Sequence, residues 1–185
     1  KNSEIRQKGG IKSSIVAKVK KGDTLYLQEE LDNWSRVATA DGYSGYIKKE
    51  VLSDPKDDNE EHASTAPEYT NISKDYKINL AFHQVTSMDG NATLAQMVAD
   101  AQGVNTISPT WFSVTDNNGT ISSLASADYV NQAHAMGMEV WGLIDNFNSG
   151  TDNLTFLSST AARANIIQQL MTQAASVGLD GINLD

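Results

Sequence analysis

The residues best suited to chemistry follow four apolar segments in the C-terminal half of the chain. A pair of polar side chains ends each segment: His83 and Gln84, Thr110 and Trp111, Asp145 and Asn146, then Asn183 and Asp185. If the segments are parallel strands, their carboxyl ends meet at one edge of a sheet, where α/β enzymes build their active sites. The spacing alone does not name the reaction.

Several kinds of chemistry are excluded or disfavoured by what the sequence contains. Cysteine is absent, which removes disulfides, thiolate catalysis and cysteine-based zinc sites. His134 falls in a predicted helix with no second histidine four residues away, so we expect no metal site and no cofactor. The segment His83-Gln-Val-Thr-Ser-Met follows the first apolar run in place of a glycine-rich phosphate loop. A nucleotide-binding site therefore loses its main support.

The elements that would position these residues alternate between strand and helix. Helical periodicity includes Leu94, Met97, Val98 and Ala101, while Ser126 and Ser159 are expected to cap two later helices. Gly103, Gly137 and Gly178 are expected to end the three helices. Strands are predicted at 78–82, 104–112, 139–144 and 179–185.

This alternation predicts a parallel sheet with helical crossovers, with its strands in the order 1-2-3-4. A doubly wound sheet and a (β/α) barrel are the two candidate architectures, and the missing phosphate loop favours the barrel. Pro109 is expected at the end of its strand, since proline donates no hydrogen bond to a ladder.

Charge divides the sequence into three parts. Residues 1–53 carry a net charge of +3, residues 54–74 of −4 and residues 75–185 of −8, which gives −9 for the 185 residues. The middle part holds two of the three prolines and few large apolar residues, so it is predicted to be an acidic linker between two domains. The acidic balance argues against nucleic-acid binding, and no apolar run is long enough to span a membrane.

The predicted N-terminal domain shows the alternation of apolar and polar residues that is typical of short strands. Apolar and polar residues alternate over 15–19, 25–27, 35–39 and 43–47. Asp41-Gly42 is a hairpin signal, which we interpret as a type I′ turn with positive φ at both residues. About five antiparallel strands in so few residues are typical of a small closed barrel.

Residues 1–53 resemble a bacterial SH3-like domain. The resemblance is carried by the Lys21-Gly22 turn, the strand Asn33-Trp-Ser-Arg-Val37 and the segment Gly42-Tyr-Ser-Gly-Tyr-Ile47. It implies a module that binds cell wall or a cell-wall peptide, often attached to wall hydrolases. Trp34, Tyr43 and Tyr46 either form an aromatic binding face or pack within the small barrel.

Residues 77–185 resemble the first half of the catalytic barrel of glycoside hydrolase family 18, the chitinase-like family. Leu179-Asp-Gly-Ile-Asn-Leu-Asp185 is similar to the start of the family's fourth-strand signature, D-G-x-[DN]-x-D-[aromatic]-E. Three earlier stretches support the resemblance in the same order: KINLAFHQVT, NTISPTWFSVTDNNGTISS and YVNQAHAMGMEVWGLIDNF. The implied fold is a small all-β barrel followed by part of a (β/α)8 barrel.

This resemblance implies retaining hydrolysis assisted by the substrate. The N-acetyl carbonyl of an aminosugar attacks the anomeric carbon while a glutamate protonates the leaving oxygen, and Asp185 would orient the acetamido group. Asp180 and Asn183 would support Asp185 from beneath, although many members have Asp where this chain has Asn183. The expected substrate-binding residues are Gln84, Trp111, Asp145 and Asn146, with Trp111 as a stacking surface for a sugar ring.

The signature's glutamate, two residues beyond Asp185, is not among these residues. We therefore expect the 185-residue chain to be a fragment that is inactive alone. Its open barrel would be completed by the remainder of the barrel or by a second copy.

Together the two resemblances imply part of a secreted hydrolase acting on chitin, peptidoglycan or spore cortex. The protein would lie outside the cell, at the wall or spore of a bacterium of Gram-positive type. A non-catalytic wall-binding protein on an inactivated barrel is the alternative. An unrelated enzyme for a small phosphorylated ligand is disfavoured, because the glycine-rich loop is missing.

Overall fold

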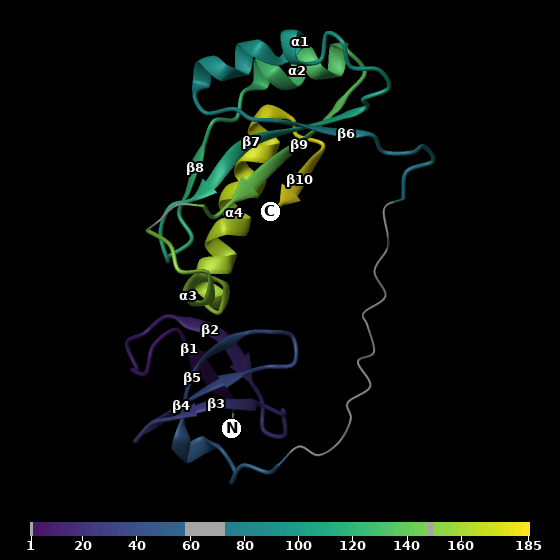
Figure 1. Cartoon of the computed structure of the whole chain (residues 1–185). Helices are drawn as coiled ribbons and strands as arrows, with labels where there is room; N and C mark the ends of the chain where they lie inside the picture. The colour runs from purple at the N-terminus through teal and green to yellow at the C-terminus, as the bar shows by residue number, and fades with distance from the viewer. Residues whose placement is uncertain (1, 58–72, 148–149) are drawn as a thin grey trace. The chain divides into compact units, whose positions relative to one another are not determined.

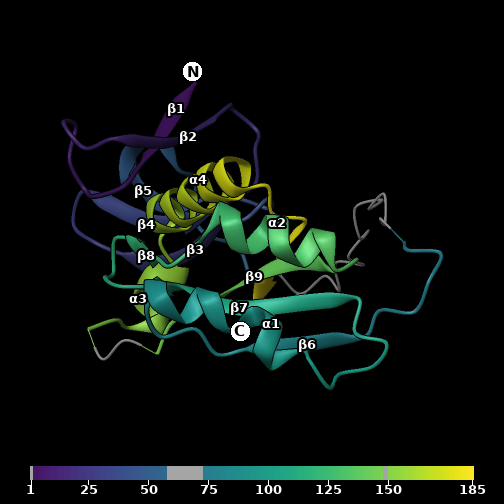
Figure 2. The ribbon, with the colours of Figure 1, turned by 90° about the horizontal axis from the view of Figure 1, so that it is seen from above.

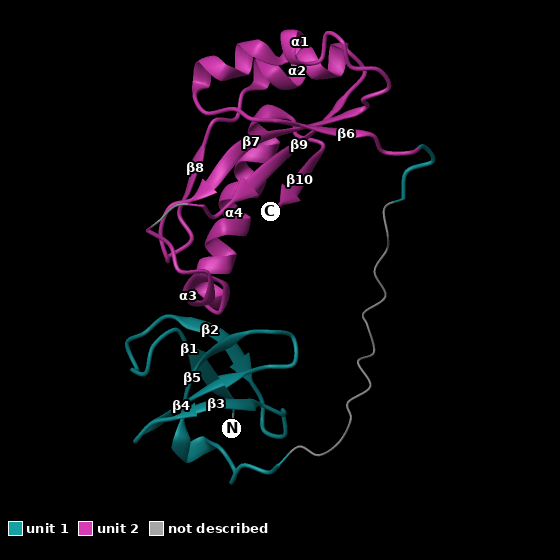
Figure 3. Cartoon of the chain, in the orientation of Figure 1, with its two compact units in different colours: residues 1–76 teal, residues 77–185 magenta. Residues whose placement is uncertain are grey.

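The computed structural model describes residues 2–57, 73–147 and 150–185. The chain divides into two compact units, Lys1–Tyr76 (unit 1) and Lys77–Asp185 (unit 2), which Figure 3 colours separately. Most of the predicted acidic linker, residues 58–72, lies outside the described residues. None of the helices in the described ranges is both long and apolar enough to cross a membrane.

Unit 1 is all-β. Its five strands form an antiparallel sheet in the order β2-β1-β5-β4-β3. Every second side chain of a strand points to the same face of the sheet. Ile5, Val19, Val37 and Ile47 therefore lie on one face and form an apolar core. The elements are β1 (Ser3–Arg6), β2 (Ile15–Val19), β3 (Tyr26–Glu30), β4 (Trp34–Ala38), β5 (Ser44–Lys48) and a 3-10 helix (Lys49–Val51).

The predicted hairpin between β4 and β5 is present, but its turn is not type I′. Only Gly42 has a positive φ, of 86°, and no residue other than glycine does so among the described residues. The N–H of Gly42 bonds to the carbonyl of Thr39, and Thr39 N–H bonds to the carbonyl of Tyr43. The turn thus needs left-handed backbone at one residue only, where glycine supplies it without strain.

Unit 2 is an α/β domain around a parallel sheet. The strands β6 (Leu80–His83), β7 (Thr106–Val114), β9 (Glu139–Asp145) and β10 (Gly181–Leu184) lie side by side in sequence order, as predicted (Figure 1). A short strand that the pattern did not predict, β8 (Ile121–Ser123), pairs antiparallel with the end of β7. The described residues form a sheet and not a closed barrel.

The helices of unit 2 begin at the predicted caps. Ser126 and Ser159 accept hydrogen bonds from backbone N–H groups in the first turns of α2 (Ala127–Ala135) and α4 (Thr160–Val177). The two helices are seen from above in Figure 2. A further short helix, α3 (Asn153–Leu157), was not predicted.

The first helix is much shorter than its periodicity predicts. After a 3-10 helix (Met88–Thr93), α1 spans only Leu94–Met97. Leu94 is completely buried and Val98 packs partly against the core, but Met97 and Ala101 are exposed, so the segment after Val98 gains little apolar contact. Short helices are only marginally stable unless an apolar face packs against the rest of the protein, so the helix ends at Met97.

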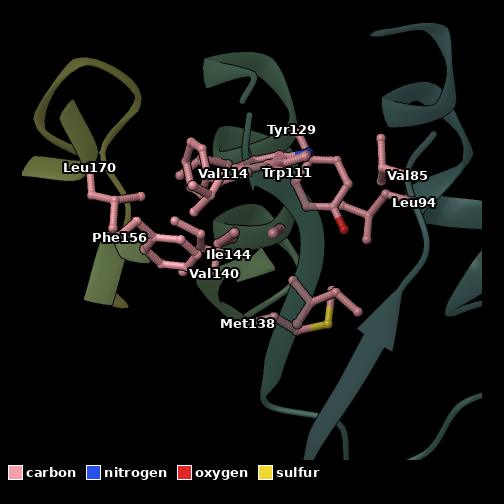
Figure 4. Close-up of a cluster of buried hydrophobic side chains, with 14 of the residues drawn as sticks. Val85, Leu94, Trp111, Val114, Tyr129, Met138, Val140, Ile144, Phe156 and Leu170 are labelled. Carbon is pink, nitrogen blue, oxygen red and sulfur yellow. The ribbon is translucent and has the colours of Figure 1, made fainter. Parts of the chain in front are cut away.

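The helices cover one face of the sheet and share its core (Figure 4). Val140 and Ile144 of β9 contribute to it, as do Tyr129 of α2 and Leu170 of α4. Leu143 points the other way and does not belong to this cluster, although it is buried. We call the uncovered side of the sheet the open face.

Two features of β7 depart from a regular strand. Pro109 lies inside it and not at its end, which corrects the prediction. The hydroxyl of Ser108 donates to the carbonyl of Trp141 there (2.8 Å), so a side chain supplies a donor beside the residue that lacks one. The register then shifts by one residue at Trp111, between the pairs Thr110–Leu143 and Phe112–Ile144.

We predict that Gly119→Ala destabilises unit 2 much more than Gly137→Ala. Both glycines have φ of +77°, but a Cβ at Gly119 would lie 2.3 Å from the Ala162 carbonyl, whereas nothing lies within 4 Å at Gly137. The control is expected to lose about 1 kcal/mol of unfolding free energy and Gly119→Ala about 3 kcal/mol. Urea unfolding followed through amide NMR signals of unit 2 measures both, and equal losses would contradict the steric argument.

Candidate functional site

The open face carries a row of polar side chains held by one another. Asn183 on β10 donates its Nδ2 hydrogen to Ser108 Oγ on β7 across the intervening strand β9 (3.2 Å). Since Ser108 in turn donates to the Trp141 carbonyl, its hydroxyl is oriented to accept from Asn183. The amide of Asn183 is therefore fixed on the open face.

Asp145 stands on the same face at the carboxyl end of β9. Its Oδ1 accepts a hydrogen bond from the Ser113 hydroxyl (2.8 Å) and one from the Phe147 backbone N–H (3.3 Å). Ser113 reaches Asp145 because the shifted register of β7 pairs these two residues. Two donors thus fix a partly buried carboxylate at the edge where the sequence predicts a site.

Asp185 follows β10 directly beside Asp145. Its N–H donates to the Ile144 carbonyl (3.1 Å), and the register Leu184–Ile144 continues to the pair Asp185–Asp145. Alternation from Asn183 puts Asp185 on the open face, and adjacent strands lie about 4.8 Å apart. The structure therefore puts the backbones of Asp145 and Asp185 side by side, with the Asn183 amide on the same face of the sheet.

Gln84 and Asn146 also lie at this edge of the sheet. Gln84 is exposed directly after β6. Asn146 donates from Nδ2 to Asn153 Oδ1 on α3, and its carbonyl accepts from the Thr151 hydroxyl. Asn146 is thus engaged in holding the loop that leads to α3.

Trp111 does not join the predicted site, which corrects the expected sugar platform. It is 2 % exposed in the core on the helix side, edge-on to the Tyr129 ring at 5.0 Å between centroids. Its Nε1 donates to Asn91 Oδ1 (2.7 Å), and Asn91 donates to the Leu124 carbonyl. A buried indole needs such a partner, and this one anchors the 3-10 helix to β7.

Asp180 is also removed from the site. It precedes β10, at the opposite end of the strand from Asp185. Its Oδ2 accepts from the Val140 backbone N–H (2.7 Å) and contacts His134 Nε2 on α2 (2.8 Å). The prediction that Asp180 supports Asp185 from beneath is wrong, because Asp180 instead ties α2 to the amino end of the sheet.

The side chain of His83 points to the helix side of the sheet, where both of its ring nitrogens have a hydrogen-bond partner. Its Nδ1 lies 2.8 Å from the Tyr129 hydroxyl and its Nε2 lies 3.0 Å from Thr93 Oγ1. Thr93 gives its single proton to the Gly90 carbonyl, so it accepts from His83 Nε2–H, and Nδ1 accepts from Tyr129. Burial lowers the pKa of His83 and raises that of Tyr129.

Within the described ranges, no three His, Asp or Glu residues are grouped to hold a metal ion.

Two aromatic residues of this part of unit 2, one after the carboxyl end of β9 and one in its amino half, were not predicted as site residues. Phe147 is 77 % exposed in the loop after Asp145 and Asn146. Trp141 lies on the open face, donates from Nε1 to Glu139 (3.0 Å) and covers Gly181, where a Cβ would lie 2.9 Å from the indole. The position of Phe147 directly after a predicted polar strand end was the signal that could have identified it.

In unit 1, Trp34 and Tyr46 lie outside the apolar core. They alternate with the inward-facing Val37 and Ile47 and are partly exposed, while Tyr43 is 43 % exposed in the hairpin. Arg36 pairs with Tyr46 across the strands. The aromatic side chains therefore have the exposure that a binding face requires.

We predict that unit 2 loses stability as the pH falls, because of His83. The folded state holds the ring neutral, whereas the unfolded chain takes up a proton near the ordinary pKa of about 6.5. The stabilisation is fully present above that value and decreases as the pH falls toward the lowered pKa of the folded state. Urea unfolding between about pH 7.5 and 5.0 measures this trend.

One variant assigns the pH dependence to His83. His83→Gln, which keeps a polar side chain at this position but removes the titratable ring, is expected to reduce the slope of stability against pH. An unchanged slope in His83→Gln would contradict the assignment.

Comparisons with known proteins agree with the two folds. Residues 1–54 match the family model of the bacterial SH3 domain. Among solved structures, the chain is similar to the "C-terminal domain of putative chitinase from Desulfitobacterium hafniense DCB-2", at 23 % identity and a TM-score of 0.51 over 59 % of this chain and 33 % of that one. No curated protein matches the chain.

Two further chitinase structures are more distant. One, from Chromobacterium violaceum ATCC 12472, has 18 % identity and a TM-score of 0.44, with coverage of 58 % of this chain and 34 % of that one. The other, ChiC from Aspergillus fumigatus, has 19 % identity and a TM-score of 0.41, with coverage of 60 % and 44 %. The chain thus spans between one third and one half of the length of these structures.

Proposed function

We propose that this chain belongs to a wall-associated glycoside hydrolase acting on glycans that contain N-acetylglucosamine. The carrying observation is the placement of Asp145, Asn183 and Asp185 together on the open face, at the carboxyl ends of adjacent parallel strands. The likeness of the fold to a chitinase domain supports the choice. Chitin, peptidoglycan and spore cortex all offer the required aminosugar.

In this proposal the substrate supplies its own nucleophile, as in family 18 hydrolases. Asp185 accepts the acetamido N–H and turns the acetamido carbonyl toward the anomeric carbon. Asn183, fixed by Ser108, supports that arrangement as a neutral amide. The acid that protonates the leaving oxygen is expected two residues after Asp185 and is not among these residues.

Phe147 takes the stacking role first expected of Trp111. Phe147 is 77 % exposed, and its backbone N–H is bonded to Asp145, so the residue directly adjoins that carboxylate. Aromatic rings provide large, rigid apolar surfaces of the kind that the apolar face of a sugar ring packs against.

Unit 1 supplies wall targeting in this proposal. Its match to the bacterial SH3 domain and its partly exposed Trp34 and Tyr46 support a role in binding wall material or a wall peptide. Such a module works outside the cell, at the wall or spore surface, in a bacterium of Gram-positive type.

A non-catalytic wall-binding protein is the second candidate. It is favoured by two features of the sequence: Asn183 stands where many family 18 members have aspartate, and Ile144-Asp145-Asn146-Phe147 stands where the family has a small motif of Ser-Gly-Gly type. Hydrolysis of an N-acetylglucosamine polymer by the protein carrying the complete signature separates the two candidates.

We predict that residues 1–185 bind N-acetylglucosamine oligomers without hydrolysing them. The binding carboxylates are present, but the acid is not, and its loss removes the proton that the leaving oxygen needs. NMR titration with the tetrasaccharide measures binding, and release of reducing sugar measures hydrolysis. Hydrolysis by this purified chain would overturn the assignment of the acid.

We predict that Phe147→Ala weakens oligosaccharide binding by about fivefold, because it removes the stacking surface. Leu154→Ala is the matched control, since Leu154 on α3 is equally exposed at 77 %. Trp111→Phe is expected to leave affinity unchanged but to cost about 1–3 kcal/mol of stability, because Asn91 loses its donor. If Trp111→Phe lost affinity and Phe147→Ala did not, Trp111 and not Phe147 would be the stacking residue.

A further inference from the structure

We infer that Asp145 sets the sugar specificity of the proposed site, favouring N-acetylglucosamine over N-acetylmuramic acid at the position beside Asp185. The inference rests on the proposed function. It concerns the point at which the two wall sugars differ, the substituent on ring carbon C3, which is a hydroxyl in one sugar and a lactyl ether ending in a carboxylate in the other.

The geometry puts a second carboxylate next to the one that holds the acetamido group. Asp145 and Asp185 are neighbours in register on adjacent parallel strands, about 4.8 Å apart at their backbones. Ser113 and the Phe147 N–H both donate to Asp145 Oδ1, so this side chain is held in place. Both of these donors use Oδ1, so among the described residues Oδ2 keeps its capacity to accept a hydrogen bond from a ligand.

The sugar presents two neighbours to the acetamido-bearing carbon. One is the anomeric carbon, which carries the leaving group and is served by the acid that follows Asp185 along its strand. The other is C3, and we infer that it faces Asp145, the carboxylate on the adjacent strand. A hydroxyl on C3 donates to Asp145, whereas a lactyl ether brings no proton and adds a negative charge.

The charge balance of unit 2 disfavours that carboxylate. Residues 75–185 hold ten acidic residues and only two cations, Lys77 and Arg163. Lys77 precedes β6 and so lies at the amino end of its strand, while Arg163 in the first turn of α4 donates to the Leu157 carbonyl and to Thr160 Oγ1. A lactyl carboxylate placed beside Asp145 and Asp185 would therefore enter a region where negative charges predominate.

Binding of two disaccharides to residues 1–185 tests the inference. We compare N-acetylglucosamine and N-acetylmuramic acid, each β-1,4-linked to N-acetylglucosamine, by NMR titration. The wild-type chain is expected to prefer the first by about tenfold or more, and the preference should shrink with added salt, which screens the repulsion. Asp145→Asn is expected to reduce the preference to about threefold, through tighter binding of the muramic acid disaccharide.

Two control variants test whether the preference depends on the charge of Asp145 or only on the net charge of the protein. Asp100→Asn removes the same charge from an exposed position after α1 and is expected to keep the full preference. Ser113→Ala, which frees Asp145 without changing its charge, is expected to give an intermediate preference, and it serves if Asp145→Asn does not fold.

The outcomes distinguish the inference from the function. If the wild-type chain binds neither disaccharide, the proposed function fails, and the inference with it. If it binds the N-acetylglucosamine disaccharide but shows no preference, or if Asp145→Asn keeps the full preference, the specificity role of Asp145 is refuted and the proposed function stands.

Discussion

One extra residue in β7 determines which side chains reach the open face of unit 2. Without the shift at Trp111, strict alternation would turn Phe112 toward the open face and Ser113 toward the helices. With it, Trp111 and Phe112 both enter the core, and Ser113 is left beside Asp145. The core and the candidate site therefore depend on the same local irregularity, as is common for bulges near functional sites.

The core on the helix side accepts large aromatic residues because each polar tip has a partner. Tyr129 donates to His83, and the Trp111 indole donates to Asn91. These bonds connect β6, β7, α2 and the 3-10 helix before α1, so the crossover between the first two strands is held by polar contacts as well as by packing. The cost of burying polar groups is offset only while every partner is in place.

The sequence predicted the features that depend on local pattern. Strand order, the caps at Ser126 and Ser159 and the stop at Gly178 follow from periodicity and backbone preference, and the structure confirms them. The face on which a strand-end residue lies was not predictable, since it depends on register and on the shift in β7. Trp111 and Asp180 were misplaced for that reason, and α1 was overextended because its outer turns find no core.

The first and last aspartates of the segment Asp180-Gly-Ile-Asn-Leu-Asp185 have different roles in the structure. Asp180 binds Val140 and His134 on the helix side, whereas Asp185 stands at the far end of the strand on the open face. In a descendant that lost its catalytic role, selection for folding would still hold the first aspartate while the last one drifted. Survival of the first aspartate in a related chain would therefore report on the fold, and under the proposed function only the last one would report on the site.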